Sequence, residues 1–409
     1  MKADYKVLGD YIRLIDQRNR DLSVTNLLGV SIEKRFIPPI ANIVGTDLSS
    51  YKIVRTGQFA YGPVTSRNGE KISIAYLDGD DCIISSSYTV FEVMKKDELD
   101  SEYLMLWFSR PEFDRYARYK SHGSVREIFD WNEICMVELP VLAIEEQRKI
   151  VKAYKAITDR IALKKQINDN LAQMLRLLYE QWFYRFEFPN EQNLPYNRAN
   201  GELEWNDKLK RRIPKGWKVQ TMLSNELFSV ISSGVDRFST KKYYATADII
   251  GSSIGDGSDI EYETRESRAN MQPVINSVWF AKMKNSIKHL FLNKEMSSFV
   301  DNSILSTGFY GLECNEISFE YIASVVSAPI FEITKDRLSH GATQQGIGDD
   351  DMANITLLIP DDTTLRKYHE ATKGFFAKIS NNILENKRLI AIRNFLLPLL
   401  MNGQATIAE

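Results

Sequence analysis

An internal repeat constrains the fold of this sequence more than any other feature. Ser121-His122-Gly123 returns as Ser339-His340-Gly341, and the difference in numbering between the two copies (339 minus 121) is the repeat offset. The same offset holds far downstream: Gln147-Arg148-Lys149-Ile150, for example, falls on Leu365-Arg366-Lys367-Tyr368. A repeat of this length is a duplicated module, longer than the periods of solenoid proteins. The sequence therefore predicts two similar modules that form a pseudo-two-fold body and grip one ligand twice, as duplex DNA can be gripped.

Composition limits the class of protein without naming its function. The 409 residues suffice for two to three domains, and 44% hydrophobic with 26% charged residues is typical of a soluble globular protein. Cys82, Cys135 and Cys314 form no CxxC pair, which indicates a reducing cytoplasm and no metal framework. No apolar run approaches the length of a membrane span and the N-terminus has no signal-peptide pattern, so neither is expected. The net charge of −2 means that any nucleic-acid surface must be local.

Changes of pattern along the chain divide it into five segments. In the first, turn residues alternate with short β-branched runs, and we expect strands at Ser73–Tyr76, Cys82–Ser85 and Tyr88–Val93. The residues between the two helical patterns are polar and contain several Pro and Gly, which is typical of a surface linker. The expected segments are a globular module at 1–140, a helix at 141–185, a linker at 186–213, a second globular module at 214–358 and a second helix at 359–403.

Both helical patterns carry a seam with the 4-3 spacing of a heptad repeat. The seam of the first helix comprises Ile150, Tyr154, Ile157, Ile161, Lys164, Asn168, Leu171, Leu175, Leu178 and Trp182. The seam of the second comprises Tyr368, Thr372, Phe375, Ile379, Asn382, Asn386, Leu389, Arg393, Leu396 and Leu400, and Gly403 follows as a helix C-cap. A helix of roughly 40 residues spans about 60 Å, too long for a small domain to bury. We therefore predict an α+β protein whose two mixed α/β modules, in a pseudo-two-fold arrangement, are separated by a long antiparallel two-helix coiled coil.

Polar residues interrupt the middle of each seam. If a pseudo-two-fold axis passes through the midpoints of the seams, Lys164 faces Asn386 and Asn168 faces Asn382. Buried polar pairs in a seam fix register and orientation at some cost in stability. We expect these four residues to set the register of the coiled coil and the separation of the modules. The alternative is that the four side chains turn outward on a locally loose seam.

Catalytic motifs are absent from the sequence. It contains no GxxxxGK[ST] phosphate loop, no GxGxxG fingerprint after a strand, no HExxH and no metal-ligand spacing among its four histidines. One fragment resembles a metal-dependent nuclease: Pro360-Asp361 followed by Glu385-Asn386-Lys387. Its second half falls within the heptad helix, which gives the wrong side-chain direction, so no catalytic residue and no metal site is expected.

Recognition chemistry remains, in three places that recur between the modules. Arg, Lys and Asn side chains read base edges or hold phosphates, and short polar side chains after a glycine suit phosphate contacts. The first two places are basic segments with aromatic neighbours, one in each module, and they correspond because Phe59-Ala60 aligns with Phe280-Ala281. The third place is the segment just after Ser-His-Gly, which occurs in both modules. The alternatives are solvated basic loops over a core and glycine turns that lead into a strand. The candidate DNA-binding residues are Arg55, Arg67, Asn68, Lys71, Ser124, Arg126, Lys282, Lys284, Asn285, Lys288, His289, Thr343, Gln344 and Gln345.

These motifs together resemble the specificity subunit of type I restriction–modification systems. The resemblance covers nearly the whole chain and is most specific from Gly123 to Trp182, including Glu146-Gln147-Arg148-Lys149-Ile150-Val151; Pro214-Lys215-Gly216-Trp217 and Asn276–Met283 are also typical. The second copy departs from the pattern at Thr363–Tyr368. The resemblance implies two target recognition domains, each for half of a bipartite site in double-stranded DNA, and two spacer helices that form a platform for two methyltransferase subunits.

The resemblance also implies where the chemistry lies. The partner methyltransferase brings S-adenosylmethionine and methylates adenine, and a motor and nuclease subunit, when present, cleaves DNA. The chain itself then needs no cofactor, acts in the cytoplasm and is not an enzyme. Two other functions stay open: a coiled-coil scaffold whose globular ends bind proteins, without DNA specificity, and a stand-alone nuclease that uses Asp361 and Glu385.

Overall fold

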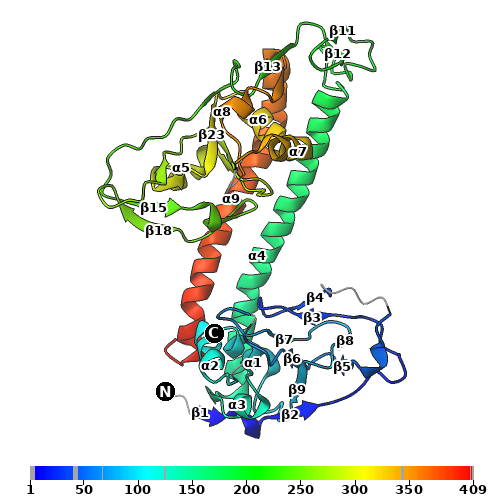
Figure 1. Cartoon of the computed structure of the whole chain (residues 1–409), viewed down its shortest axis with the longest axis vertical. Coiled ribbons are helices and arrows are strands. Elements are labelled where there is room, and N and C mark those ends of the chain that lie inside the picture. Colours follow the sequence, from blue (N-terminus) through cyan, green and yellow to red (C-terminus); the bar gives the residue numbers. More distant parts are fainter. Residues whose placement is uncertain are drawn as a thin grey trace. The chain divides into compact units, whose positions relative to one another are not determined.

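The computed structural model describes residues 5–39, 45–66, 68–123, 126–341, 345–405 and 407. The chain divides into two compact units, one made of residues 1–159 with 391–409 and the other of residues 160–390. The two longest helices each contribute to both units, and every other element belongs to one unit (Figure 1). No helix in the described ranges combines the length and the apolar character that a membrane span needs.

The first unit is a mixed α/β structure. Its strands are β1 (Tyr5–Val7), β2 (Ile12–Ile15), β3 (Gly29–Val30), β4 (Phe36–Ile37), β5 (Lys52–Val54), β6 (Phe59–Tyr61), β7 (Ile74–Tyr76), β8 (Cys82–Ile84), β9 (Thr89–Val93) and β10 (Glu138–Pro140). Its short helices are α1 (Ser101–Phe108), α2 (Pro111–Tyr119) and α3 (Trp131–Cys135). The expected strands at Ser73–Tyr76, Cys82–Ser85 and Tyr88–Val93 are thus confirmed as β7, β8 and β9.

The second unit is also mixed α/β. Its strands are β11 (Leu203–Asn206), β12 (Arg211–Pro214), β13 (Lys218–Thr221), β14 (Phe228–Val230), β15 (Thr240–Tyr244), β16 (Ile249–Ile250), β17 (Ser253–Ile254), β18 (Ser258–Glu261), β19 (Ala269–Met271), β20 (Ser277–Ala281), β21 (His289–Leu292), β22 (Ser303–Ser306), β23 (Phe309–Cys314) and β24 (Thr356–Ile359). Its short helices are α5 (Ser297–Asp301), α6 (Phe319–Ser327), α7 (Pro329–Leu338) and α8 (Asp349–Met352).

The two units repeat one fold, as the internal repeat predicts. The first contains an antiparallel sheet in the order β2-β9-β6-β7, and the second contains an antiparallel sheet in the order β14-β23-β20-β21. Helices α6, α7 and α8 begin at the repeat offset from α1, α2 and α3. Pro111 and Pro329 occupy the first position of α2 and α7, where a missing N–H costs no helical hydrogen bond. Stacked rings on the central strands recur as well, Phe59 on Phe91 and Phe280 on Tyr310.

The first and last strands of each copy pair with one another. Strand β1 runs antiparallel to β10, and β13 runs antiparallel to β24. Outside the shared sheet, each copy has a two-stranded hairpin, β3–β4 or β16–β17, and an antiparallel strand pair, β5–β8 or β19–β22. The second copy extends this pair into the larger sheet β18-β15-β22-β19, in which β15 and β22 are parallel.

The long helices are α4 (Ile144–Tyr179), which continues as a π-helical turn at Glu180–Tyr184, and α9 (Asp362–Met401). Every residue of the two expected seams is buried or half-buried, so the heptad spacing marks the covered face of each helix. Gly403 has a φ of +66° and follows the end of α9. The Gln404 N–H donates to the Leu399 carbonyl at 2.8 Å, which is the closure expected of a glycine C-cap.

Within the second unit the two long helices run antiparallel. Asn168 Nδ2 donates to the Ile379 carbonyl at 3.3 Å, and Asn386 Nδ2 donates to the Ile161 carbonyl at 3.2 Å. Asn382 Nδ2 donates to Asn168 Oδ1 at 2.7 Å, which is the pairing expected from the seam midpoints.

The expected pairing of Lys164 with Asn386 is wrong. Lys164 Nζ instead donates to Asn382 Oδ1 at 3.3 Å and forms an ion pair with Glu385 at 2.6 Å. A half-buried ammonium gains more from a carboxylate than from a neutral amide, and Glu385 lies one residue before Asn386. Asn386 Oδ1 is buried and has no hydrogen-bond partner among the described residues.

The expected surface linker at 186–213 is in large part folded structure. Phe186, Phe188 and Ile213 are buried in the core of the second unit, and β11 and β12 form a hairpin. Phe188 stacks on Trp217 with ring centroids 5.1 Å apart. The prediction failed because the polar average of this segment hides spaced aromatic residues, each of which gains about 1.5–3 kcal/mol from burial.

Candidate nucleic-acid interface

Two predicted recognition elements meet in the first unit. They are the hairpin turn between β6 and β7 (described at 62–66 and 68–73) and the Ser-His-Gly loop (described at 121–123, 126 and 127). The Thr65 N–H donates to the Glu127 carbonyl at 2.9 Å, and its hydroxyl donates to Ser121 Oγ at 2.9 Å. Ile128, just beyond the loop, forms β-bridges to both Val64 and His122. Turn and loop are therefore one continuous surface feature.

The second unit joins the corresponding elements. They are the hairpin turn between β20 and β21 (residues 282–288) and the second Ser-His-Gly loop (described at 339–341 and 345). The Lys284 N–H donates to the Gln345 carbonyl at 2.9 Å, and its ammonium donates to Gln345 Oε1 at 2.9 Å. Gly346 forms β-bridges to both Met283 and His340, as Ile128 does in the first copy. The same two-element feature is thus built twice.

The glycines of the two loops hold the same backbone conformation. Gly123 has a φ of +135° and Gly341 a φ of +133°, a region that other residues rarely adopt. A Cβ on Gly123 would lie 2.1 Å from the Arg126 carbonyl oxygen. The serines before them also act alike, because Ser121 Oγ donates to the Ala117 carbonyl and Ser339 Oγ donates to the Lys335 carbonyl. The Ser-His-Gly repeat is therefore a helix-to-loop junction.

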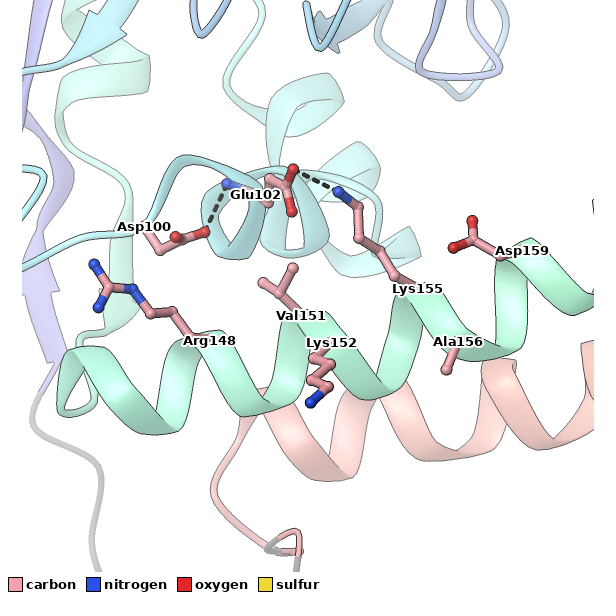
Figure 2. Close-up of a pocket in the computed structure, with 8 residues that line it drawn as sticks. All are labelled: Asp100, Glu102, Arg148, Val151, Lys152, Lys155, Ala156 and Asp159. Atoms are coloured by element: carbon pink, nitrogen blue, oxygen red, sulfur yellow. Dashed lines mark hydrogen bonds and ion pairs between the residues drawn. The ribbon is translucent and has the colours of Figure 1, made fainter.

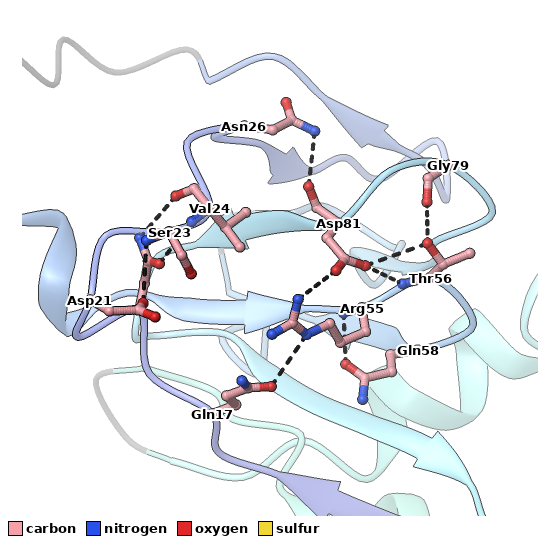
Figure 3. Close-up of polar contacts among 11 residues, drawn as sticks. Gln17, Asp21, Ser23, Val24, Asn26, Arg55, Thr56, Gln58, Gly79 and Asp81 are labelled. Carbon is pink, nitrogen blue, oxygen red and sulfur yellow. Dashed lines mark hydrogen bonds and ion pairs between the residues drawn. The ribbon is translucent and has the colours of Figure 1, made fainter.

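In the first unit some of the predicted residues form ion pairs or hydrogen bonds within the protein, and others are exposed without such a contact being described. Arg55 forms an ion pair with Asp81 at 2.6 Å (Figure 3), and this hydrogen bond holds the pKa of the Asp81 carboxyl below its ordinary value. Lys71 forms an exposed ion pair with Glu33 at 3.0 Å, and Asn68 Nδ2 donates to the Val64 carbonyl at 3.3 Å. Arg126 is exposed at the end of the Ser-His-Gly loop. Arg67 and Ser124 lie outside the described residues.

In the second unit the predicted residues line the hairpin turn with graded exposure. Asn285 and Gln345 are exposed, whereas Lys282, Lys284 and Lys288 are half-buried. Lys282 lies over the Tyr310 ring, and burial lowers the pKa of its ammonium. Lys288 donates to the Thr246 carbonyl. Thr343 and Gln344 lie outside the described residues.

His289 is not on this surface. Its side chain is buried, and its Nε2 lies 2.8 Å from Glu332 Oε1 on α7. It sits on β21 rather than in the turn, on a strand whose residues Leu290 and Leu292 are buried as well. The expectation that its imidazole contacts DNA is therefore withdrawn.

A charged contact ties each globular module to a long helix. In the first unit Lys155 of α4 donates to Glu102 of α1 at 2.6 Å, beside a groove of about 470 Å³ (Figure 2). In the second, His369 Nδ1 of α9 lies 2.8 Å from Glu320 of α6, which is the repeat equivalent of Glu102. Burial raises the pKa of Glu320, against the opposing hydrogen bond from His369. Each module is thereby fixed to its long helix at an equivalent acidic residue.

The nuclease-like fragment does not assemble into a site. Asp361 caps α9 by accepting from the Thr364 N–H and also accepts from Trp217 Nε1, both at 2.9 Å. Glu385 is paired with Lys164 and Arg160, and it lies further along α9 by about 35 Å of helix. Within the described parts of the chain, no group of three or more His, Cys, Asp or Glu is arranged to hold a metal ion.

Sequence reasoning missed the ion pairs behind the two hairpin turns, one half-buried and one buried. Asp114 of α2 pairs with Lys34 at 2.5 Å, and Glu332 of α7 pairs with Lys335 at 2.6 Å. The signal that could have found them is the repeat itself, because Asp114 and Glu332 are separated by the repeat offset. The lysines gave no such signal, since they occupy unrelated positions in the two copies.

This chain is similar in sequence to known proteins. It is 26% identical over 335 residues to the type I restriction enzyme MjaIX specificity subunit of Methanocaldococcus jannaschii, covering 78% of this chain and 72% of that protein. It is 21% identical to the type I restriction enzyme HindI specificity subunit of Haemophilus influenzae, covering 97% of this chain and 98% of that protein. No protein-family model matches.

A solved structure has the same fold. The crystal structure of the type I restriction–modification system S subunit from M. genitalium superposes with a TM-score of 0.56 and 13% identity, covering 97% of this chain and 96% of that one. This likeness concerns the fold, and the sequence matches carry the relationship. The chain is therefore a relative of the type I restriction enzyme specificity subunits over most of its length, as the sequence resemblance predicts.

Proposed function

We propose that this chain is the non-catalytic specificity subunit of a type I restriction–modification complex. Each globular module reads one half of a bipartite site in double-stranded DNA, and the coiled coil holds the modules in a pseudo-two-fold arrangement. Two methyltransferase subunits bring S-adenosylmethionine and methylate adenine, and a motor and nuclease subunit, when present, cleaves DNA. The complex works in the cytoplasm, where its DNA lies.

One observation carries the proposal: the same turn-and-loop feature is built twice in a relative of specificity subunits. In both copies a hairpin turn and a Ser-His-Gly loop are joined by hydrogen bonds and a shared β-bridge residue, while the side chains that face solvent differ. A constant frame with different exposed residues is what two half-sites of different sequence require. The small net charge agrees with partners that supply part of the phosphate grip.

Exposed apolar pairs on the long helices support two equivalent partner surfaces. Met174 and Leu177 on α4 are 50% and 52% exposed, and Ile392 and Phe395 on α9 are 46% and 69% exposed. The second pair is the repeat equivalent of the first, and each unit carries one of the two pairs. Large apolar side chains at solvent-exposed helix positions are typical of protein contact surfaces. We assign one methyltransferase subunit to each pair.

The length of the coiled coil then sets the distance between the two half-sites. One heptad inserted at equivalent positions of α4 and α9 adds about 10 Å of helix while it keeps the seam in phase. The gap between the two halves of the recognised site should become longer, with both half-site sequences unchanged. An unchanged gap in a folded variant would show that helix length does not set the distance between the half-sites.

Selection of DNA by the assembled complex tests the function directly. The chain, co-purified with a type I methyltransferase subunit from the same organism, is incubated with a random duplex library at fixed salt, and bound duplexes are sequenced. The proposal predicts two short motifs at one fixed spacing. A scaffold with protein-binding ends would select no motif. Exchange of residues 1–140 for the same module of another specificity subunit should change one motif and leave the other.

A further inference from the structure

A buried lysine holds both ends of the hairpin turn in the second unit. The side chain of Lys335 on α7 is 0% exposed, and its ammonium donates to the Ser286 carbonyl at 3.0 Å and to the Ala281 carbonyl at 3.3 Å. These carbonyls belong to the last residue of β20 and to the turn between β20 and β21. The neighbouring Asp336 accepts from the Asn285 N–H at 3.0 Å. Helix α7 therefore fixes the turn at three backbone positions.

An acid completes this arrangement. Glu332, one helical turn before Lys335, forms an ion pair with the ammonium at 2.6 Å and accepts a hydrogen bond from His289 at 2.8 Å. A buried ammonium needs such a partner, because an unpaired charge in the interior costs several kcal/mol. His289, Glu332 and Lys335 thus form a buried polar network under the turn, and none of them is exposed to solvent.

The first unit has an acid at the equivalent helix position, paired with a lysine from elsewhere in the chain. Asp114, the fourth residue of α2 as Glu332 is of α7, accepts from the Ile72 N–H at 3.0 Å and from Lys34 Nζ at 2.5 Å. Ile72 lies at the end of the first hairpin turn, and Lys34 belongs to the β3–β4 hairpin, whereas the β16–β17 hairpin at the corresponding place in the second copy has no lysine between its strands. Lys71 of the turn also pairs with Glu33 beside Lys34. Here the β3–β4 hairpin supplies the charge that secures the turn.

We propose that these acid–lysine pairs are positioning residues that fix each hairpin turn for DNA recognition, Glu332 with Lys335 in one module and Asp114 with Lys34 in the other. This rests on the proposed function, because the turns must contact DNA for their position to matter. A turn held by a buried network loses less conformational entropy when it binds, and it presents its side chains in one geometry. The two pairs act independently, each on its own half-site.

The experiment uses the full chain in complex with its methyltransferase. Lys335→Met keeps the volume of the side chain and removes the charge, and Lys335→Met combined with Glu332→Gln removes both charges so that no unpaired carboxylate destabilises the fold. Amide hydrogen exchange should rise about five- to tenfold in residues 282–288 of either variant, the effect of losing hydrogen bonds of ordinary strength. Residues 62–73 should keep the wild-type exchange rate. Lys34→Met is the matched control and should show the reverse.

Half-site selection supplies the second measurement. Both Lys335 variants should lose discrimination at the half-site of the second module, about tenfold, and retain it at the other, with Lys34→Met again reversed. Unchanged exchange in residues 282–288 would show that Lys335 and Glu332 do not hold the turn in place. Faster exchange with unchanged selectivity would overturn its role in recognition. If the wild-type complex selects no half-site, the proposed function fails, and with it the recognition role. The exchange rates still decide whether Lys335 and Glu332 hold the turn in place.

Discussion

The polar layer of the coiled-coil seam can be tested by replacing Asn382 with leucine. Asn382 is 1% exposed and has one short hydrogen bond, to Asn168 Oδ1 at 2.7 Å, and one long one, from Lys164 at 3.3 Å. Lys164 keeps its ion pair with Glu385 in the variant, so only Asn168 loses an essential partner. A buried acceptor left unpaired costs about 1–3 kcal/mol, and the added apolar surface of leucine offsets part of it. We expect Asn382→Leu to lower the free energy of unfolding by about 1–2 kcal/mol.

The double variant Asn168→Leu with Asn382→Leu should recover that loss, because both partners are replaced by the residue that heptad seams favour. Chemical denaturation followed by helical circular dichroism gives the four free energies of a double-mutant cycle, with an expected coupling of about 1–3 kcal/mol. Asn386→Leu is the matched control. The variant loses the hydrogen bond from Asn386 Nδ2 to the Ile161 carbonyl but also removes a buried Oδ1 that lacks a partner among the described residues, so the change in stability should stay within about 0.5 kcal/mol.

The cycle also separates stability from register. The double variant should be as stable as wild type but recognise sites with more than one gap between the halves, because its uniform apolar seam no longer defines one register. Additive single effects, or an Asn382→Leu variant no less stable than Asn386→Leu, would contradict the assignment of these residues as a register device.

Three further predictions follow from local geometry. Gly123→Val should lower the thermal midpoint of the first module by several degrees, because the φ of +135° and the 2.1 Å approach of a Cβ to a carbonyl oxygen exclude a side chain; an unchanged midpoint would contradict this. Burial raises the pKa of Glu332, but hydrogen bonds from His289 and Lys335 outweigh it and hold the pKa below its ordinary 4.5. The stability advantage of wild type over Glu332→Gln should therefore be complete above pH 4.5 and shrink as the pH falls, and denaturation curves that stay parallel down to acid pH would refute it. Phe395→Lys should reduce the methyltransferase bound per chain from two to one in mass measurements, and two copies retained would exclude this surface.

The repeat predicted the architecture because periodicity is a property of the chain itself. The repeat offset alone is enough to place three short helices of one copy from those of the other, and the heptad spacing identified the covered face of both long helices. The strands β7, β8 and β9 followed from β-branched runs between turn residues. Such local and periodic signals do not depend on knowing what each segment packs against.

Partner choice could not be predicted in the same way. Arg55 finds Asp81 and Lys164 finds Glu385 through contacts that are long in sequence, and each cation prefers a carboxylate that composition alone cannot place. His289 illustrates the same limit, since one residue decides whether it lies in the exposed turn or on the buried strand. The aromatic residues at 186–213 were hidden for another reason, because the average polarity of a segment does not show where its few large apolar side chains fall.

Single-molecule sequencing of adenine methylation tests the central claim most directly. Genomic DNA is compared between cells that carry this gene, cells that lack it and cells that carry it on a plasmid, all with the partner methyltransferase expressed. The account predicts that one bipartite methylated motif disappears on deletion and returns on complementation, and that its two halves are the motifs the two modules select in vitro. A methylome that is the same in all three strains would contradict a specificity function for this chain.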